Sequence, residues 1–258
     1  MAQLLPYFDG LGWLLLMLGP LLLSQRWLHR EIQLVFLLIT RRQNVALILF
    51  SLLFFPGVLL HEGSHYVMAR ILGVSTGGFS LIPSLMPNGK LRLGYVETTA
   101  TDFLRESLIG TAPLITGGAV IAYLGVSRLG LVPLAAFIAQ ADWPGFWQGF
   151  LALPAQTDFW LWFYLAFTVS STMLPSASDR RAWLPVALVA LVLVGLALLA
   201  GAGPWMIEHM APLLNRAFLA LSTVFGVSLV LHLVILLPFR LFRELLLWLT
   251  GQRIVSGA

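Results

Sequence analysis

The chain carries a short pattern of ionisable residues, His61-Glu62-Gly63-Ser64-His65, directly after an uncharged apolar run at 45–60. In a helix, residues four positions apart share a face, so the imidazoles of His61 and His65 can bind one metal ion. Glu62 lies beside them and can act as general base toward a water at that ion. Ionisable side chains at membrane depth cost roughly 2.5–3.5 kcal/mol each on insertion scales, so three in one hydrophobic helix predict a metal site. The alternative is a pair of histidines that only hydrogen-bond within a helix bundle.

The composition places this motif in a membrane protein. Of 258 residues, 59% are hydrophobic and only 10% are charged, and the mean hydropathy is +0.91. Soluble domains carry about 25% charged residues. The net charge of +4 comes from scattered arginines, which in membrane proteins mark cytoplasmic ends and lipid headgroups, so no nucleic-acid partner is expected. Because the chain has no cysteine, metal ligands must be His, Asp or Glu.

The apolar runs predict an all-α polytopic membrane protein with about six transmembrane helices, since a span needs about 20 apolar residues. The expected spans are a short one at 11–24 and further ones at 44–72, 103–126, 159–174, 183–200 and 218–238. The basic stretch 27–43 is expected to lie in the membrane interface. The chain then divides into an N-terminal part (1–43), a core with the motif (44–182), and two C-terminal spans with a basic tail (183–258).

A small membrane-associated β-hairpin is expected after the motif helix. The runs 79–86 and 91–98 flank Pro87-Asn88-Gly89-Lys90, and Asn-Gly between two extended runs is a strong hairpin signal. The sequence leaves open whether this hairpin is a plain surface element or contacts a substrate.

A third metal ligand is expected, because catalytic zinc usually has three protein ligands and one open position. Asp179 follows a span that ends at Met173-Leu174-Pro175. Proline breaks a helix, and the short polar turn beyond it can fold the acid back toward the metal. Asp179 could instead pair with Arg180 or Arg181 at a membrane surface. His232, in the middle of the last span, is the second choice of ligand, and Glu208-His209 is expected in a loop on the opposite side.

These features together resemble the site-2 protease family of zinc intramembrane metalloproteases. The resemblance covers 44–183 and has three parts: the H-E-x-x-H motif, the small-residue span beginning Arg105-Glu106 and containing Pro113, and the proline-then-aspartate motif that ends at Asp179. Arg180 follows the aspartate where the family often has glycine. The resemblance implies one Zn²⁺ per chain, held by His61, His65 and Asp179, with Glu62 as the catalytic residue.

The expected function is therefore zinc-dependent hydrolysis of a peptide bond in or near a transmembrane segment of a membrane-protein substrate. Three alternatives stay open: a catalytically inactive relative acting as a membrane chaperone or adaptor, a membrane metal transporter, and a CAAX-type membrane metalloprotease, which would need a downstream glutamate ligand.

The chain is expected in a bacterial-type cell membrane. If the first span enters from the cytoplasm, the motif helix, the hairpin, Asp179 and the tail all fall on the cytoplasmic side, together with the larger share of the 15 Lys and Arg residues. The active site is then expected to open toward the cytoplasm.

Overall fold

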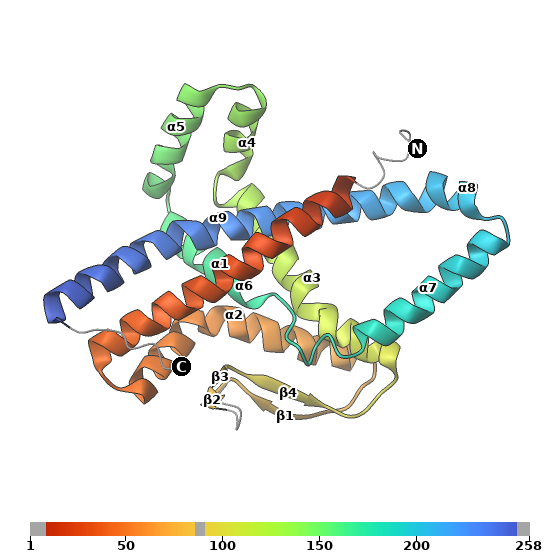
Figure 1. The fold of residues 1–258 in the computed structure, drawn as a ribbon, viewed down its shortest axis with the longest axis horizontal. Coiled ribbons are helices and arrows are strands. Elements are labelled where there is room, and N and C mark those ends of the chain that lie inside the picture. The colour runs from red at the N-terminus through yellow and green to blue at the C-terminus, as the bar shows by residue number, and fades with distance from the viewer. Residues whose placement is uncertain (1–8, 86–90, 252–258) are drawn as a thin grey trace.

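The computed structural model describes residues 9–85 and 91–251, and this part of the chain is mostly helical (Figure 1). Five helices form the main bundle: α1 (Asp9–Thr40), α2 (Gln43–Ile71), which carries the motif, α3 (Phe103–Ser127), α6 (Phe159–Thr172) and α9 (Ala211–Thr250). The other helical elements are α4 (Leu131–Ala139), α5 (Trp143–Ala152), η2 (Leu153–Ala155), α7 (Trp183–Leu199), α8 (Gly203–Trp205) and the π-helical turn η3 (Met206–Met210). In Figure 1, α1 and α9 run side by side, and α4 and α5 form a hairpin that projects from the bundle.

Four helices of the described chain are long and apolar enough to cross a membrane: α1, α2, α3 and the continuous helical run Gly203–Thr250. At 1.5 Å per residue, the 25 residues of α3 extend for about 37 Å, which exceeds the roughly 30 Å hydrocarbon core of a bilayer. These four helices indicate a multi-pass membrane protein. Of the other expected spans, α6 has only 14 residues and α7 has 17.

Residues 9–40 differ from the expected short span followed by an interfacial segment. They form one helix, α1, of 32 residues, which continues through the basic stretch to Thr40. Neither proline nor glycine occurs between Leu21 and Thr40, so nothing interrupts the helix there. In addition, Glu31 of α1 forms a largely buried ion pair of 2.9 Å with Arg243 of α9, which fixes this polar half against the bundle.

The last helix is also longer than expected. The sequence places the end of the final span at Pro238, but α9 continues through this proline to Thr250. Proline removes one backbone hydrogen bond and kinks a helix. The residues that follow, Phe239-Arg240-Leu241-Phe242-Arg243-Glu244-Leu245-Leu246-Leu247, are mostly good helix formers, and they continue the helix beyond that position.

The expected antiparallel pairing after the motif helix is confirmed. Strand β1 (Thr76–Ser80) pairs with β4 (Tyr95–Thr98), and the short β2 (Ser84–Leu85) pairs with β3 (Leu91–Arg92). The turn Pro87-Asn88-Gly89-Lys90 lies outside the described residues. The strands lie along α2, so this small sheet covers the helix that carries the motif (Figure 1).

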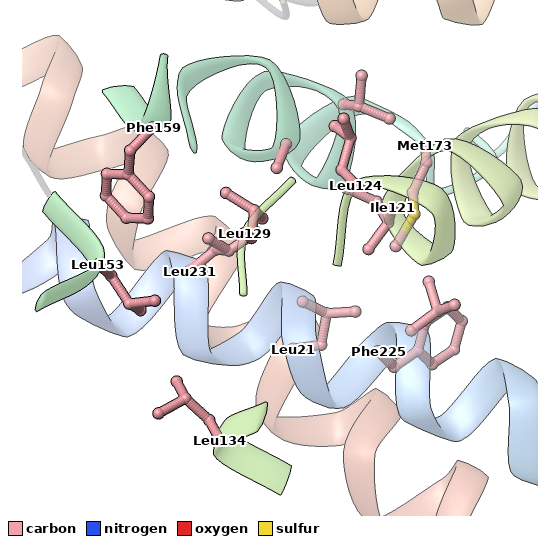
Figure 2. Packing of buried hydrophobic residues seen from close by; sticks show 13 residues of the cluster. Leu21, Ile121, Leu124, Leu129, Leu134, Leu153, Phe159, Met173, Phe225 and Leu231 are labelled. Carbon is pink, nitrogen blue, oxygen red and sulfur yellow. The ribbon is translucent and has the colours of Figure 1, made fainter. Parts of the chain in front are cut away.

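The core joins α1, α3, α6 and α9 through a cluster of buried apolar side chains (Figure 2). Leu21 of α1, Ile121 of α3 and Met173, just after α6, are almost completely buried. In a bilayer, lipid tails are as apolar as these side chains, so close packing rather than water exclusion has to hold the helices together. This packing fixes the end of α6, where the polar site begins.

Candidate metal centre

Helix α2 presents both histidines of the motif to α6 and α3. Gly57, one turn before His61, lies so close to α6 that a Cβ atom there would overlap the backbone carbonyl of Thr168. A glycine is therefore needed for the two helices to approach at this point. The close approach brings His61 to the C-terminal end of α6.

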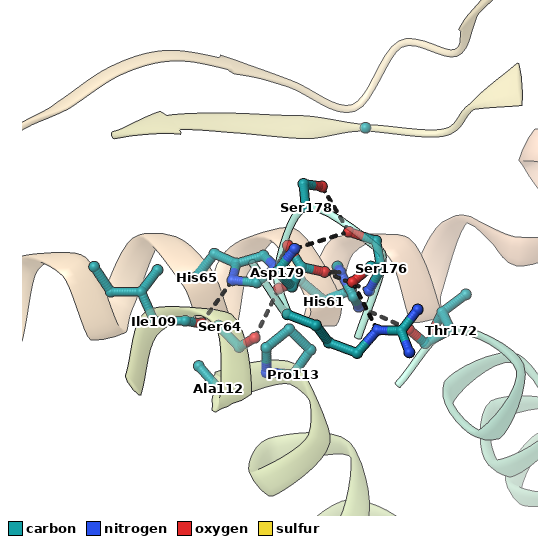
Figure 3. Close-up of polar contacts among 12 residues, drawn as sticks. His61, Ser64, His65, Ile109, Ala112, Pro113, Thr172, Ser176, Ser178 and Asp179 are labelled. Atoms are coloured by element: carbon teal, nitrogen blue, oxygen red, sulfur yellow. Dashed lines mark hydrogen bonds and ion pairs between the residues drawn. The ribbon is translucent and has the colours of Figure 1, made fainter. Parts of the chain in front are cut away.

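Each imidazole is oriented by a backbone carbonyl (Figure 3). His61 Nδ1 lies 2.6 Å from the carbonyl oxygen of Thr172, and His65 Nδ1 lies 2.8 Å from that of Ile109. Because a carbonyl only accepts, Nδ1 carries the hydrogen in both rings and the Nε2 lone pairs are left for a ligand. Metal-binding histidines almost always show this arrangement, in which the second ring nitrogen donates to a carbonyl or carboxylate.

The sequence explains why both carbonyls are free to accept a hydrogen bond from an imidazole. Thr172 is the last residue of α6, where the final carbonyls have no partner within the helix. Ile109 lies four residues before Pro113, which has no N–H to donate to it. The proline of α3 therefore frees the carbonyl that holds His65.

Asp179 is returned to the histidines by the connection 173–182 between α6 and α7. The Ser176 N–H donates to Asp179 Oδ2 over 2.6 Å, and the Asp179 N–H donates to the Ser176 hydroxyl over 3.3 Å. Burial alone raises the pKa of the Asp179 carboxyl, but the two neighbouring imidazoles and the hydrogen bond from Ser176 outweigh it and hold that pKa well below its usual range. Asp179 is thus a carboxylate at neutral pH, the form that binds metals.

The alternative pairing of Asp179 with the neighbouring arginines is not what the structure shows. The guanidinium of Arg181 pairs with Glu106 of α3, at 2.6 Å, and that of Arg180 donates to the Ser176 carbonyl. Asp179 is left facing His61 and His65.

The three side chains meet at distances that suit a metal ion. His61 Nε2 and His65 Nε2 are 3.2 Å apart. Asp179 Oδ2 lies 3.7 Å from the first nitrogen and Asp179 Oδ1 lies 3.4 Å from the second. A tetrahedron with metal–ligand bonds of 2.0–2.1 Å has edges of about 3.3 Å. Two imidazole lone pairs and a carboxylate pointing at one another need positive charge between them, so the group could hold a metal ion.

Glu62 lies beside this group and outside it. Its side chain is 9% exposed, and its Cγ lies against Gly94, where an added Cβ would come within 2.9 Å of it. The positively charged Arg92 of β3 also acts electrostatically on Glu62. The small sheet therefore closes over the carboxylate that the sequence assigns as general base.

The other candidate ligands lie elsewhere. His232 is completely buried, and its Nε2 is within 3.3 Å of the Ser170 hydroxyl and 3.0 Å of the Ser171 hydroxyl, so it contacts α6 and does not join the three metal donors. Glu208 and His209 lie in the π-helical turn η3 rather than in a loop, and both are exposed.

An open apolar groove of about 540 Å³ runs along α2 beside the motif. Gly63 and Ser64, the two residues between Glu62 and His65, form part of its wall, together with Ala112 and Thr116 of α3. The groove gives an apolar segment a route to the motif helix.

Comparisons of the chain with known protein families, with curated proteins and with solved structures find no match. The arguments for function therefore rest on the residues of this chain and on their geometry.

Two parts of the site were not anticipated from the sequence. The carbonyls of Ile109 and Thr172 have no side-chain signature, although the proline four residues after Ile109 is a readable signal for the first of them. The other part that the sequence did not reveal is the close approach of Gly110 to the main-chain carbonyl of Asp179. A Cβ atom at position 110 would overlap this carbonyl.

Gly110→Ala is expected to weaken metal binding by roughly ten-fold or more, the scale of changes next to a metal site. The added methyl collides with backbone, so the 173–182 connection must move and carry Asp179 away from the imidazoles. Zinc affinity, measured by competition with a chromophoric chelator, tests this. Gly118→Ala, on the same helix, is the control, because its Cβ would make an ordinary contact of 3.9 Å with Val224. Equal affinities for the two variants would contradict the prediction.

Pro113→Ala is expected to stabilise α3 and yet weaken zinc binding. Proline is about 3 kcal/mol less favourable than alanine in a helix interior, but the restored N–H would compete with His65 for the Ile109 carbonyl. Thermal unfolding and zinc affinity, measured side by side, should move in opposite directions. Pro238→Ala in α9, an exposed position, should change stability alone. Unaltered zinc affinity in Pro113→Ala would show that this carbonyl does not matter to His65.

Proposed function

We propose that this protein is a zinc-dependent intramembrane protease similar to the site-2 proteases. One observation carries the proposal: the imidazoles of His61 and His65 and the carboxylate of Asp179 face one another closely enough to share a metal ion, inside a bundle of membrane-spanning length. The buried carboxylate of Glu62 lies near all three residues. A purely structural metal site has no need of the additional buried carboxylate.

A zinc ion held by these residues would lower the pKa of a water molecule and polarise the scissile carbonyl. Glu62 would act as the general base: it would take a proton from the attacking water as the water oxygen forms a bond to the carbonyl carbon. Glu62 then delivers the proton to the amide nitrogen as the C–N bond breaks, so the products are a carboxylic acid and an amine. The carbonyls of Thr172 and Ile109 keep the two imidazoles in place during these steps.

The substrate class in this proposal is a transmembrane protein segment. Such a helix hides its carbonyls in its own hydrogen bonds and must unwind locally before it is cut. The apolar groove along α2 supports approach from the membrane, because it is continuous with the motif residues Gly63 and Ser64. No nucleic-acid partner is proposed.

The proposal also includes a membrane arrangement. The shorter helices α6 and α7 would join the four long helical runs to give about six spans. The site would open toward the cytoplasmic side of a bacterial-type membrane. The support is the expected entry of α1 from the cytoplasm, since α2 then returns to the side where α1 begins. The arginines do not decide between the two sides: Arg92, Arg105, Arg180 and Arg181 lie near Asp179. Arg41, Arg42 and Arg243 lie toward the opposite end, because α9 runs parallel to α1, so the described part of the tail is not on the side of the motif as the sequence suggested.

The test uses the full chain, purified and reconstituted in vesicles with a panel of tagged single-span membrane proteins. We expect about one zinc per chain by elemental analysis, cleavage of some panel members, loss of cleavage with 1,10-phenanthroline, and recovery when zinc is added. Zinc without cleavage of any panel member would overturn the proteolytic function in favour of the inactive relative. Failure to bind any added metal would overturn the metal centre itself.

A further inference from the structure

Polar side chains of three helices gather at the last turn of α6. His232 of α9, which is 0% exposed, contacts the hydroxyls of Ser170 and Ser171. Gln25 of α1 donates its side-chain N–H to the Ser171 carbonyl over 2.6 Å. A polar histidine in the middle of a candidate membrane span is costly unless it has a role, so this contact needs an explanation beyond packing.

The same turn holds the metal centre. Ser171 and Thr172 are consecutive, and their carbonyls are both left unpaired by the end of the helix. Gln25 donates a hydrogen bond to the Ser171 carbonyl and His61 donates one to the Thr172 carbonyl, each over 2.6 Å. The turn that orients a metal-binding histidine is thus fixed from α1 and from α9.

Helix ends fray readily, and the geometry leaves little room for movement. A displacement of the last turn by about 1 Å would lengthen the contact between His61 Nδ1 and the Thr172 carbonyl to about 3.6 Å, which is no longer a hydrogen bond. The imidazole would then be free to rotate away from His65 and Asp179. Holding this turn still is therefore equivalent to holding His61.

We propose that His232 and Gln25 are positioning residues of the metal centre: they fix the last turn of α6 so that the Thr172 carbonyl sets the orientation of His61. The inference rests on the proposed metal centre and is independent of proteolysis. It assigns a role in the site to α9, a helix that contributes none of the three donor atoms.

The experiment compares wild type, His232→Leu, His232→Gln and Ser228→Ala in the full chain. Ser228 is the matched control, since it lies one turn earlier on α9, is also fully buried, and bonds only to the Val224 carbonyl of its own helix. The readouts are zinc affinity by chelator competition and the visible spectrum of the Co²⁺-loaded protein, which reports ligand geometry. We expect roughly ten-fold weaker zinc binding in His232→Leu, at the low end for outer partners of a metal site, with an altered Co²⁺ spectrum.

The glutamine variant separates positioning from packing. Its side-chain amide can still meet the Ser171 hydroxyl, so His232→Gln should keep the wild-type spectrum and most of the affinity. If His232→Leu does not fold, Ser171→Ala removes the shorter of the two contacts of His232, that of 3.0 Å, with a smaller change and should shift the spectrum in the same direction. Wild-type affinity and spectrum in the folded variants that lack the contact would overturn the inference, even if their thermal stability fell. Absence of metal from the wild type would instead overturn the centre on which it rests.

Discussion

Glu62→Gln is expected to keep about one zinc per chain and to lose peptide hydrolysis. Glu62 lies outside the three donor atoms, so replacing its carboxylate with an amide leaves His61, His65 and Asp179 undisturbed. An amide cannot accept the proton from water, and general acid–base catalysis contributes typically 10²–10⁴-fold to a rate. Elemental analysis for zinc and cleavage of the single-span panel, on the same preparation, measure both halves of the prediction.

A second glutamate provides the control for this change. Glu208 lies exposed in the turn η3 and takes no part in the centre, so Glu208→Gln should retain both zinc and cleavage. Undiminished cleavage by Glu62→Gln would remove this residue from the mechanism. Loss of zinc from it would show instead that Glu62 helps to hold the metal.

Asp179→Ala is expected to lose the metal. The variant leaves only two imidazoles, and a catalytic zinc site normally has three protein ligands. Because changes to outer partners alone cost 10–100-fold in affinity, removal of a direct ligand should cost more than roughly 100-fold. Zinc content after gel filtration should fall in Asp179→Ala and in His65→Ala, which loses a ligand from the other side of the group.

Ser178→Ala is the control in the same connection. Its hydroxyl bonds only to the Ser176 hydroxyl, is exposed, and faces away from the donor atoms, so zinc content should stay at the wild-type level. Zinc kept by Asp179→Ala but lost from His65→Ala would mean that the third ligand is another residue.

The sequence is most informative where chemistry needs particular side chains. The spacing of His61 and His65 predicts one shared helix face, and α2 provides it. Asp179, suggested by its place after Pro175, lies 3.4 Å from His65 across 114 positions of the chain. The apolar runs likewise predict a mostly helical multi-pass protein, because only closed hydrogen bonding is tolerated in lipid.

The sequence is least informative where backbone or tertiary contacts determine the position of an element or the role of a residue. The basic half of α1 has the pattern of an interfacial segment, and it is the partner Arg243, more than 200 residues away, that holds Glu31 in the bundle. Likewise, the carbonyl of Thr172 is free to accept a hydrogen bond from His61 only because α6 ends there, and no side chain in the sequence indicates this end. Gly110 shows the same limit, because its importance comes from the main chain of Asp179, which packs against it in the folded protein.

The separation of the centre along the chain has a consequence for its biosynthesis. His61 and the carbonyl that holds it are 111 residues apart, and Asp179 comes later still. A ribosome adds about 5–20 residues per second, so roughly 6–20 seconds pass between the making of the first histidine and that of its partner. During this interval the histidines enter the membrane without their third ligand. If the chain is the protease proposed above, the nascent protein is inactive until α6 and the connection beyond it are in place.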